Sequence, residues 1–110
     1  MKWYPVPDVE DAGKPFMKKI KIDNKGICVV GYGGEVYAVS AECPHAGFDL
    51  GEGWCENGNI ICPLHGYAFD LKTGKGVNDY VKTYPAKIEN NTVYVGTPTV
   101  WDDIKRIFNK

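Results

Sequence analysis

The sequence has no apolar run approaching the ~20 residues that a membrane-spanning helix needs. Its first residues, MKWYPVPD, lack the apolar core of a secretory signal peptide. It also lacks a basic excess, because 13 Lys and Arg against 14 Asp and Glu give a formal net charge of −1. A nucleic-acid-binding domain would show such an excess. These absences predict a cytoplasmic protein with neither a membrane nor a nucleic acid as its partner.

The composition is that of an ordinary globular domain. The chain has 110 residues, of which 44% are hydrophobic and 25% charged. This length is enough for one domain with one modest core. No internal repeat, low-complexity tract or linker divides the chain. We therefore expect residues 1–110 to form a single domain.

The chain has only four cysteines. Because no secretion signal precedes them, disulfide bonds are not expected. Cys28 lies in a strand-like apolar run, where a buried free thiol behaves as a small hydrophobic side chain. Cys55 is expected to be a plain thiol as well. The other two cysteines, Cys43 and Cys62, each lie close to a histidine.

These pairs form the most informative pattern in the chain. Cys43 and His45 make a C-x-H element, and Cys62 and His65 make a C-x-x-H element sixteen residues later. Two thiolates and two imidazoles fit either a tetrahedral zinc ion or a [2Fe–2S] cluster with two Cys on one iron and two His on the other. Finger-type zinc sites usually take both Cys from one loop and both His from another. Here each loop supplies one of each, which favours the cluster.

The segment resembles the cluster-binding motif of Rieske-type ferredoxins, especially the soluble ferredoxins that supply bacterial ring-hydroxylating oxygenases. The family pattern of C-x-H-x-G, C-P-x-H-x-x-x-F-D and T-G is matched here by residues 43–47, 62–70 and 73–74. The resemblance extends over about residues 3–95. It implies an all-β Rieske (ISP-like) fold of antiparallel sheets, with a cluster-binding loop subdomain at about residues 41–70.

The resemblance also implies a function. It predicts one [2Fe–2S] cluster held by Cys43, His45, Cys62 and His65, in an electron carrier rather than an enzyme. The implied partners are a flavin-dependent reductase and a terminal oxygenase, docking transiently at the tip formed by the two histidines. Two alternatives stay open: a small Rieske subunit of a larger oxidoreductase, such as assimilatory nitrite reductase, and, more remotely, a structural zinc-binding module.

Residues near the ligands bear on the reduction potential. High-potential Rieske proteins carry two further cysteines where this chain has Phe48 and Leu64, and hydroxyl groups near sulfur where it has Tyr67 and Phe69. Fewer hydrogen bonds to sulfur stabilise the reduced cluster less. We therefore expect a midpoint potential at the low end of the Rieske range, roughly −150 mV.

Other residues of the segment have two interpretations each. Phe48, Leu64 and Trp54 are candidates for shielding the cluster from water, although Trp54 could equally pack on the rest of the domain. The acidic side chains of Asp49, Glu52 and Glu56 could edge a docking face. A solvated surface position is the plainer interpretation of each acid.

The remaining sequence predicts an antiparallel meander. Residues 16–22 alternate in polarity as a half-buried strand does, and Asn and Gly at 23–26 favour a turn. Further strands are expected at residues 27–30, 35–40, 82–84, 87–89 and 92–95, the last two joined by a hairpin turn at Asn90–Asn91. Apolar residues at helical spacing predict a C-terminal helix at about 100–108. It could pack on the sheet or dock a partner.

Overall fold

The computed structural model describes residues 1–44, 49–64, 66–77 and 79–97. All strand pairs among these residues are antiparallel, and they form three sheets in a molecule of 41 × 34 × 24 Å. The all-β fold expected from the sequence is thereby confirmed. The predicted helix at about 100–108 lies outside the described residues. Within the described ranges, no helix is long and apolar enough to cross a bilayer.

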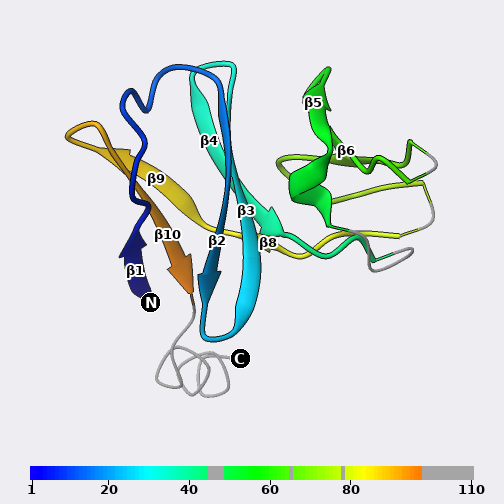
Figure 1. Ribbon diagram of the computed structural model, residues 1–110, viewed down its shortest axis with the longest axis horizontal. Helices are drawn as coiled ribbons and strands as arrows, with labels where there is room; N and C mark the ends of the chain where they lie inside the picture. The colour runs from blue at the N-terminus through cyan, green and yellow to red at the C-terminus, as the bar shows by residue number, and fades with distance from the viewer. Residues whose placement is uncertain (45–48, 65, 78, 98–110) are drawn as a thin grey trace, which may run out of the picture.

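Two of the sheets form a base at one end of the long axis (Figure 1). The first has the order β1-β10-β9, with strands β1 (Lys2–Pro5), β10 (Thr92–Thr97) and β9 (Ala86–Glu89). The second has the order β2-β3-β4-β8, with strands β2 (Phe16–Ile22), β3 (Lys25–Tyr32), β4 (Glu35–Ser40) and β8 (Thr83–Tyr84). The strands thus lie close to the predicted ranges, and β1 is one of the two edge strands of its sheet.

The hairpins close through pairs of residues with positive φ. Asp23–Asn24, Gly33–Gly34 and Asn90–Asn91 each supply two consecutive such residues, with φ between 50° and 81°. Two central residues of positive φ are the mark of a type I′ turn, whose twist suits a two-residue hairpin. The predicted turn at Asn90–Asn91 is therefore confirmed. Asn57–Gly58 closes a fourth hairpin in the same way, and its Asn-Gly sequence is the signal that could have predicted it.

Strand β3 is covered on both faces. Its residues Ile27 and Val29 belong to an apolar core between the two base sheets, together with Val93 and Val95 of β10. The alternate residues of β3, including Cys28, belong to a second core on the opposite face. Burial on both faces explains why residues 27–30 read as a continuous apolar run rather than an alternating one.

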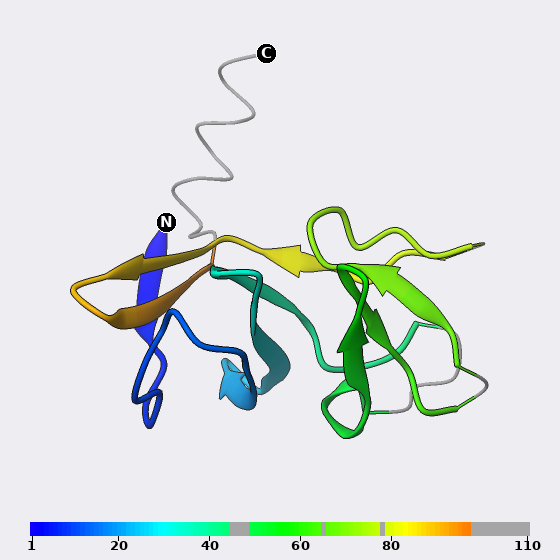
Figure 2. The same cartoon turned by 90° about the horizontal axis from the view of Figure 1, so that it is seen from above.

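The third sheet is small and lies at the other end of the molecule (Figure 2). Its strands are β5 (Trp54–Glu56), β6 (Asn59–Ile61) and β7 (Ala68–Asp70), in the order β5-β6-β7, and the 3₁₀ helix η1 (Leu50–Glu52) precedes them. The second core joins this sheet to the base; its buried members are Cys28, Val30, Val39, Ala41, Cys43, Leu50, Ile60, Cys62, Phe69, Leu71 and Val81.

Two glycines permit close backbone packing in this small unit. A Cβ on Gly53 would come within 1.8 Å of the carbonyl oxygen of Ile61. A Cβ on Gly74 would come within 2.0 Å of the carbonyl oxygen of Val81, and Gly74 also has a φ of +77°. Only a residue without a Cβ fits such positions. The Thr-Gly element of the motif therefore has a packing role, since Gly74 holds the segment that returns towards β8.

Candidate functional site

The two candidate ligand loops are closed at their bases by backbone pairing. In the first loop, Glu42 pairs with Asp49, and the N–H of Leu50 donates to the carbonyl oxygen of Ala41 at 2.7 Å. In the second, the N–H of Cys62 donates to the carbonyl oxygen of Tyr67 at 2.7 Å. Each loop thus carries its candidate cysteine next to the closure. The core and the small sheet therefore fix where the two thiols lie.

The structure brings Cys43 and Cys62 together. They are 1% and 0% exposed, belong to the same core, and their side chains interact directly. Both are free thiols. The other two predicted ligands, His45 and His65, are the only histidines of the chain and lie outside the described residues. Within the described residues, no three Cys, His, Asp or Glu side chains converge on a point that could hold a metal ion.

The surroundings of Cys62 suit a sulfur atom that binds metal. Burial raises the pKa of its thiol, the N–H of Leu64 donates towards its sulfur and lowers that pKa, and the neighbouring Cys43 raises it. Two adjacent thiolates in an apolar core would repel each other unless cations accompany them. Thiolates that bind iron are held in that way, and N–H donors to sulfur are a usual feature of iron–sulfur sites. The described half of the donor set therefore fits a [2Fe–2S] cluster.

The remaining cysteines lie in or against the same core, but neither stands beside a motif histidine. Cys28 is a free thiol with 0% exposure, as predicted, and burial, Cys55 and Asp49 together raise its pKa to about 12. Cys55 is also a free thiol, half-buried, with its pKa raised by burial. Both are free and at least half-buried, which agrees with the expectation that they are plain thiols.

Asp49 has a structural role that the sequence did not indicate. Its Oδ1 accepts the N–H of Gly51 at 2.8 Å and so caps η1, while its Oδ2 pairs with the ammonium group of Lys19 on β2. The Lys19 hydrogen bond and the Gly51 N–H both lower the pKa of this carboxyl group. Asp49 thus ties the first ligand loop to the base, and its carboxylate is engaged within the molecule.

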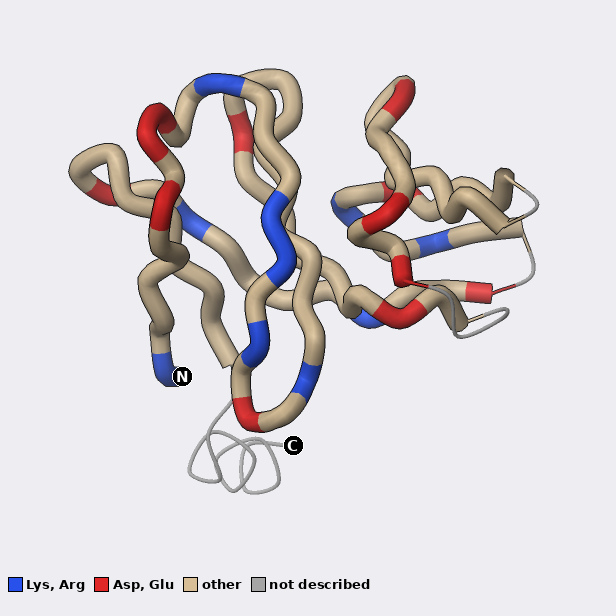
Figure 3. The backbone as a smooth tube through the Cα atoms, viewed as in Figure 1, with Lys and Arg blue, Asp and Glu red and all other residues tan. Residues whose placement is uncertain are grey.

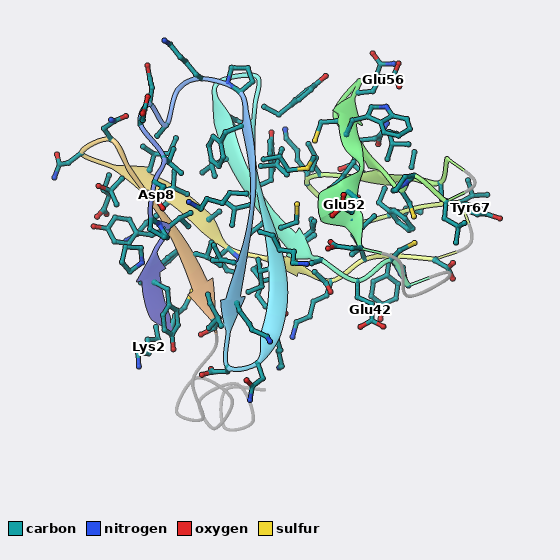
Figure 4. The ribbon with its side chains drawn as sticks, in the orientation of Figure 1. Lys2, Asp8, Glu42, Glu52, Glu56 and Tyr67 are labelled. Atoms are coloured by element: carbon teal, nitrogen blue, oxygen red, sulfur yellow. The ribbon has the colours of Figure 1, made fainter. Side chains whose placement is uncertain are left out.

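Other acidic side chains lie on the outside of the small unit. Figure 4 shows Glu42, Glu52 and Glu56 in the half of the molecule that carries the small sheet. Glu56 accepts a hydrogen bond from the indole N–H of Trp54 at 3.4 Å. Trp54 itself is 48% exposed. Its ring therefore borders solvent rather than filling the core.

The apolar shield predicted around the ligands is partly described. Leu64 packs against the core that contains both cysteines, as does the half-buried Tyr67, whereas Phe69 is 2% exposed within it. Phe48 lies outside the described residues. Gly66 has a φ of +69°, so the second loop bends where L-residues with side chains are disfavoured. The described part of the site is thus an apolar environment around two buried sulfur atoms.

Two side chains at this end of the molecule were not singled out from the sequence. Val77 and Tyr80 lie in the loop between β7 and β8 and are 84% and 73% exposed. The available signal was weak: two large apolar residues within a Gly-, Asn- and Asp-containing stretch. Such residues in a turn-rich segment are less often buried than the same residues in a strand.

Comparisons with known proteins agree with this geometry. The family described as "Rieske [2Fe-2S] domain" matches residues 2–88. The ferredoxin component of the naphthalene 1,2-dioxygenase system of Pseudomonas putida is 32% identical, covering 86% of this chain and 95% of the relative. The 3-phenylpropionate/cinnamic acid dioxygenase ferredoxin subunit of Escherichia coli (strain K12) is 33% identical, covering 86% of this chain and 90% of that subunit.

Solved structures show the same fold. The ferredoxin of carbazole 1,9a-dioxygenase from Nocardioides aromaticivorans IC177 superposes with a TM-score of 0.72 at 26% identity, covering 86% of this chain and 98% of the other. The Sphingomonas yanoikuyae B1 ferredoxin superposes with a TM-score of 0.67 at 30% identity, covering 81% and 89% of the two chains. Motif, paired buried thiols, family match and shared fold agree, and the chain belongs to the Rieske [2Fe–2S] domain family.

Proposed function

We propose that this chain is a one-electron carrier whose [2Fe–2S] cluster is held by Cys43, His45, Cys62 and His65. One observation carries the proposal: two free, buried thiols lie together at the bases of two similarly closed loops. Each loop has a histidine two or three residues after its cysteine. A bound cluster supplies one reversible electron, at a higher potential than an all-thiolate cluster gives.

The described residues have distinct tasks in this function. Cys43 and Cys62 anchor the metal centre to the core, so that it stays in place through repeated reduction and oxidation. Leu64 and Phe69 exclude water from the sulfur side. The N–H of Leu64 stabilises negative charge on the Cys62 sulfur. The chain thus holds the cluster in a fixed position within apolar surroundings.

The relatives suggest which proteins exchange the electron. Those compared above are named as ferredoxin components or subunits of dioxygenase systems, and this chain covers 90–95% of their length. We infer that it works in the cytoplasm, between a flavin-dependent reductase and a terminal oxygenase. These relatives do not favour the nitrite reductase subunit as an alternative.

The cofactor can be tested directly. Protein purified without oxygen should be coloured, and pulsed electron paramagnetic resonance of the reduced form should detect two imidazole nitrogens on the cluster. A redox titration should give a midpoint near the low end of the Rieske range, roughly −150 mV. A colourless protein that contains zinc would overturn the proposal, and a clearly positive midpoint would overturn the expected potential.

The role as a carrier needs a second measurement. A flavin-dependent reductase and a terminal oxygenase purified from the native host should reduce and reoxidise the cluster, respectively, when each is mixed with the protein in a stopped-flow spectrometer. Holoprotein that neither component reduces nor reoxidises would contradict the proposed role while leaving the cluster assignment intact.

A further inference from the structure

The sheet β1-β10-β9 has an outer face that belongs to neither apolar core. This sheet lies in the part of the base that is farther from the small sheet (Figure 1). Val93 and Val95 of β10 are 0% exposed and belong to the core between the base sheets. Tyr94 lies between them in sequence, so its side chain is on the opposite face. Trp3 of β1 pairs with Gly96 and therefore shares the face of Tyr94. Within the described part of the chain, neither core includes Trp3 or Tyr94.

The side chains on this outer face contact one another. A Cβ on Gly96 would come within 3.0 Å of Cζ3 of Trp3, so the indole ring lies against the backbone of β10. The Nζ atom of Lys87 is 4.3 Å from the centre of the Trp3 ring and 5.7 Å from the centre of the Tyr94 ring. A cation is attracted to the faces of both rings. Lys87 also pairs with Glu89 at 3.1 Å. The two half-buried rings are therefore held in an ordered aromatic layer.

The segment that follows this sheet has a sequence pattern that the proposed function does not use. Strand β10 ends at Thr97, and residues 98–110 come directly after it, outside the described ranges. Trp101, Ile104 and Phe108 recur at the spacing of one helix face. The family match ends at residue 88 and does not include this segment. A predicted amphipathic helix is thus attached beside an aromatic sheet face.

We propose that residues 100–108 form a helix that packs its apolar side chains on the outer face of β1-β10-β9 in the same chain. The dimensions fit, because such a helix is about 14 Å long and the six residues of β10 span about 20 Å. Pro98 has no N–H with which to continue the sheet ladder. Residues 98–99 then provide a connection of a common length for the chain to reverse its direction.

The charges of the face and of the segment are complementary. The face carries the ammonium group of Lys87 between its two rings, and the segment has Asp102 and Asp103 directly after Trp101. A second copy packed face to face would instead bring the Lys87 side chains of both chains to one interface. A segment joined to β10 also has a higher effective concentration at this face than a separate molecule has. These points favour the chain's own segment over a second copy.

The order of the segment reports directly on this contact. A helix this short is marginal by itself in water, because its few hydrogen bonds do not offset the cost of nucleation. Burial of its apolar face on Trp3 and Tyr94 supplies the missing stabilisation. Residues 100–108 should therefore be ordered only when the contact with the sheet is made.

The test measures NMR relaxation of the oxidised, ¹⁵N-labelled holoprotein with its full chain. The amides of residues 101–108 should have order parameters of about 0.85, the value of a rigid backbone. In the variant Ile104→Ser/Phe108→Ser these values should fall below about 0.6, and the indole N–H resonance of Trp3 should shift. This variant changes no residue of the sheet, so a misfolded base cannot cause the effect. Arg106→Ser, on the polar face of the predicted helix, is the matched control and should leave both readouts as in the wild type.

The reciprocal variant changes the sheet. Trp3→Ser/Tyr94→Ser should lower the order parameters of residues 101–108 in the same way. Trp54→Ser is its control, because Trp54 is a 48% exposed indole on the small sheet. That variant should leave the segment ordered.

Three outcomes would overturn the proposal. The first is a wild-type segment with order parameters below about 0.6. The second is an ordered segment whose variant Ile104→Ser/Phe108→Ser leaves the Trp3 resonance unmoved. The third is a dimer in analytical ultracentrifugation that Trp3→Ser/Tyr94→Ser dissociates, since a second copy would then occupy the face. None of these readouts involves electron transfer, so the inference stands or falls separately from the proposed function.

Discussion

The base and the small unit that carries the ligands are built differently. The base contains strands of seven and eight residues, β2 and β3, and has an apolar core of its own between its two sheets. The small sheet has three strands of three residues each. A sheet this small is marginal by itself, and its apolar face is buried only against the base and the candidate cysteine ligands. From this comparison we expect the base to hold its shape alone, whereas the ligand end should depend on the base and on the bound cluster.

The largest test of this comparison removes the cluster. Cys43→Ser/Cys62→Ser should lose the visible absorbance entirely, because two of the four proposed ligands are gone. Hydrogen exchange should then show faster exchange of the amides of β5, β6 and β7, while the amides of β2, β3 and β4 stay protected. Equal loss of protection in both regions would contradict the distinction.

Cys28→Ala is the control for this experiment. Cys28 is also 0% exposed and belongs to the same core, but it is not a proposed ligand. Its replacement should keep the absorbance and lower the free energy of unfolding by about 1 kcal/mol, which is typical of a small loss of buried volume. Loss of the absorbance in this variant would mean that the core, rather than the proposed ligands, holds the cluster.

A smaller effect is expected when two glycines with positive φ are replaced by alanine, because the loss of unfolding free energy should differ between them. Gly74 in the small unit has a φ of +77° and lies against the carbonyl oxygen of Val81, whereas Gly33 in the base has a φ of +63° and open space around it. Gly33→Ala should cost only the left-handed backbone strain, about 1 kcal/mol. Gly74→Ala adds a backbone clash and should cost more than about 3 kcal/mol. Urea denaturation of the holoprotein measures both.

The smallest effect concerns the link between the two regions. Asp49→Asn removes the ion pair with Lys19 and should slightly lower the thermal midpoint at neutral pH. Because the pKa of Asp49 is lowered in the folded protein, its stabilisation is present above the usual carboxyl pKa and is lost as the pH falls through the lowered value. The difference between wild type and variant should therefore vanish in acid, as scanning calorimetry at several pH values would show.

Asp8→Asn gives the comparison within the base. Asp8 pairs with Lys18 of β2 at 3.3 Å. The side chain of Asp8 is 87% exposed. Exposed ion pairs contribute little to stability, so this variant should match the wild type at every pH. If both variants behaved alike, the pairing of Asp49 would have no special role in joining the two regions.

The sequence predicted the local features well. The alternation at residues 16–22 and the turn at Asn90–Asn91 depend only on neighbouring residues, and both agree with the structure. Strand β3 is longer than the predicted 27–30, because its hairpin turn uses only Asp23 and Asn24 and leaves Lys25 free to pair with Ile22. The end of a strand can therefore be predicted only when the residues that form the adjoining turn are known.

The candidate site was predicted less evenly. The spacing of Cys43 and Cys62 sufficed to predict their pairing, since both lie beside motif histidines. The partner of Asp49 lies 30 residues away on β2, and no local pattern indicates it. The exposure of Val77 and Tyr80 was equally hidden, because it depends on how the turn at Gly76–Asp79 sits on Phe69. Both features depend on contacts between residues that are distant in sequence, which a local residue pattern does not reveal.

Strand β2 is one of the two edge strands of its sheet, and an edge strand has backbone groups that can pair with another chain. Three of its seven residues are lysines, Lys18, Lys19 and Lys21, and Figure 3 shows the basic positions as blue segments along this strand. A second copy that paired there would bring these lysines close to its own. The repulsion opposes sheet extension and aggregation. We therefore expect these lysines to disfavour extension of the sheet through this edge.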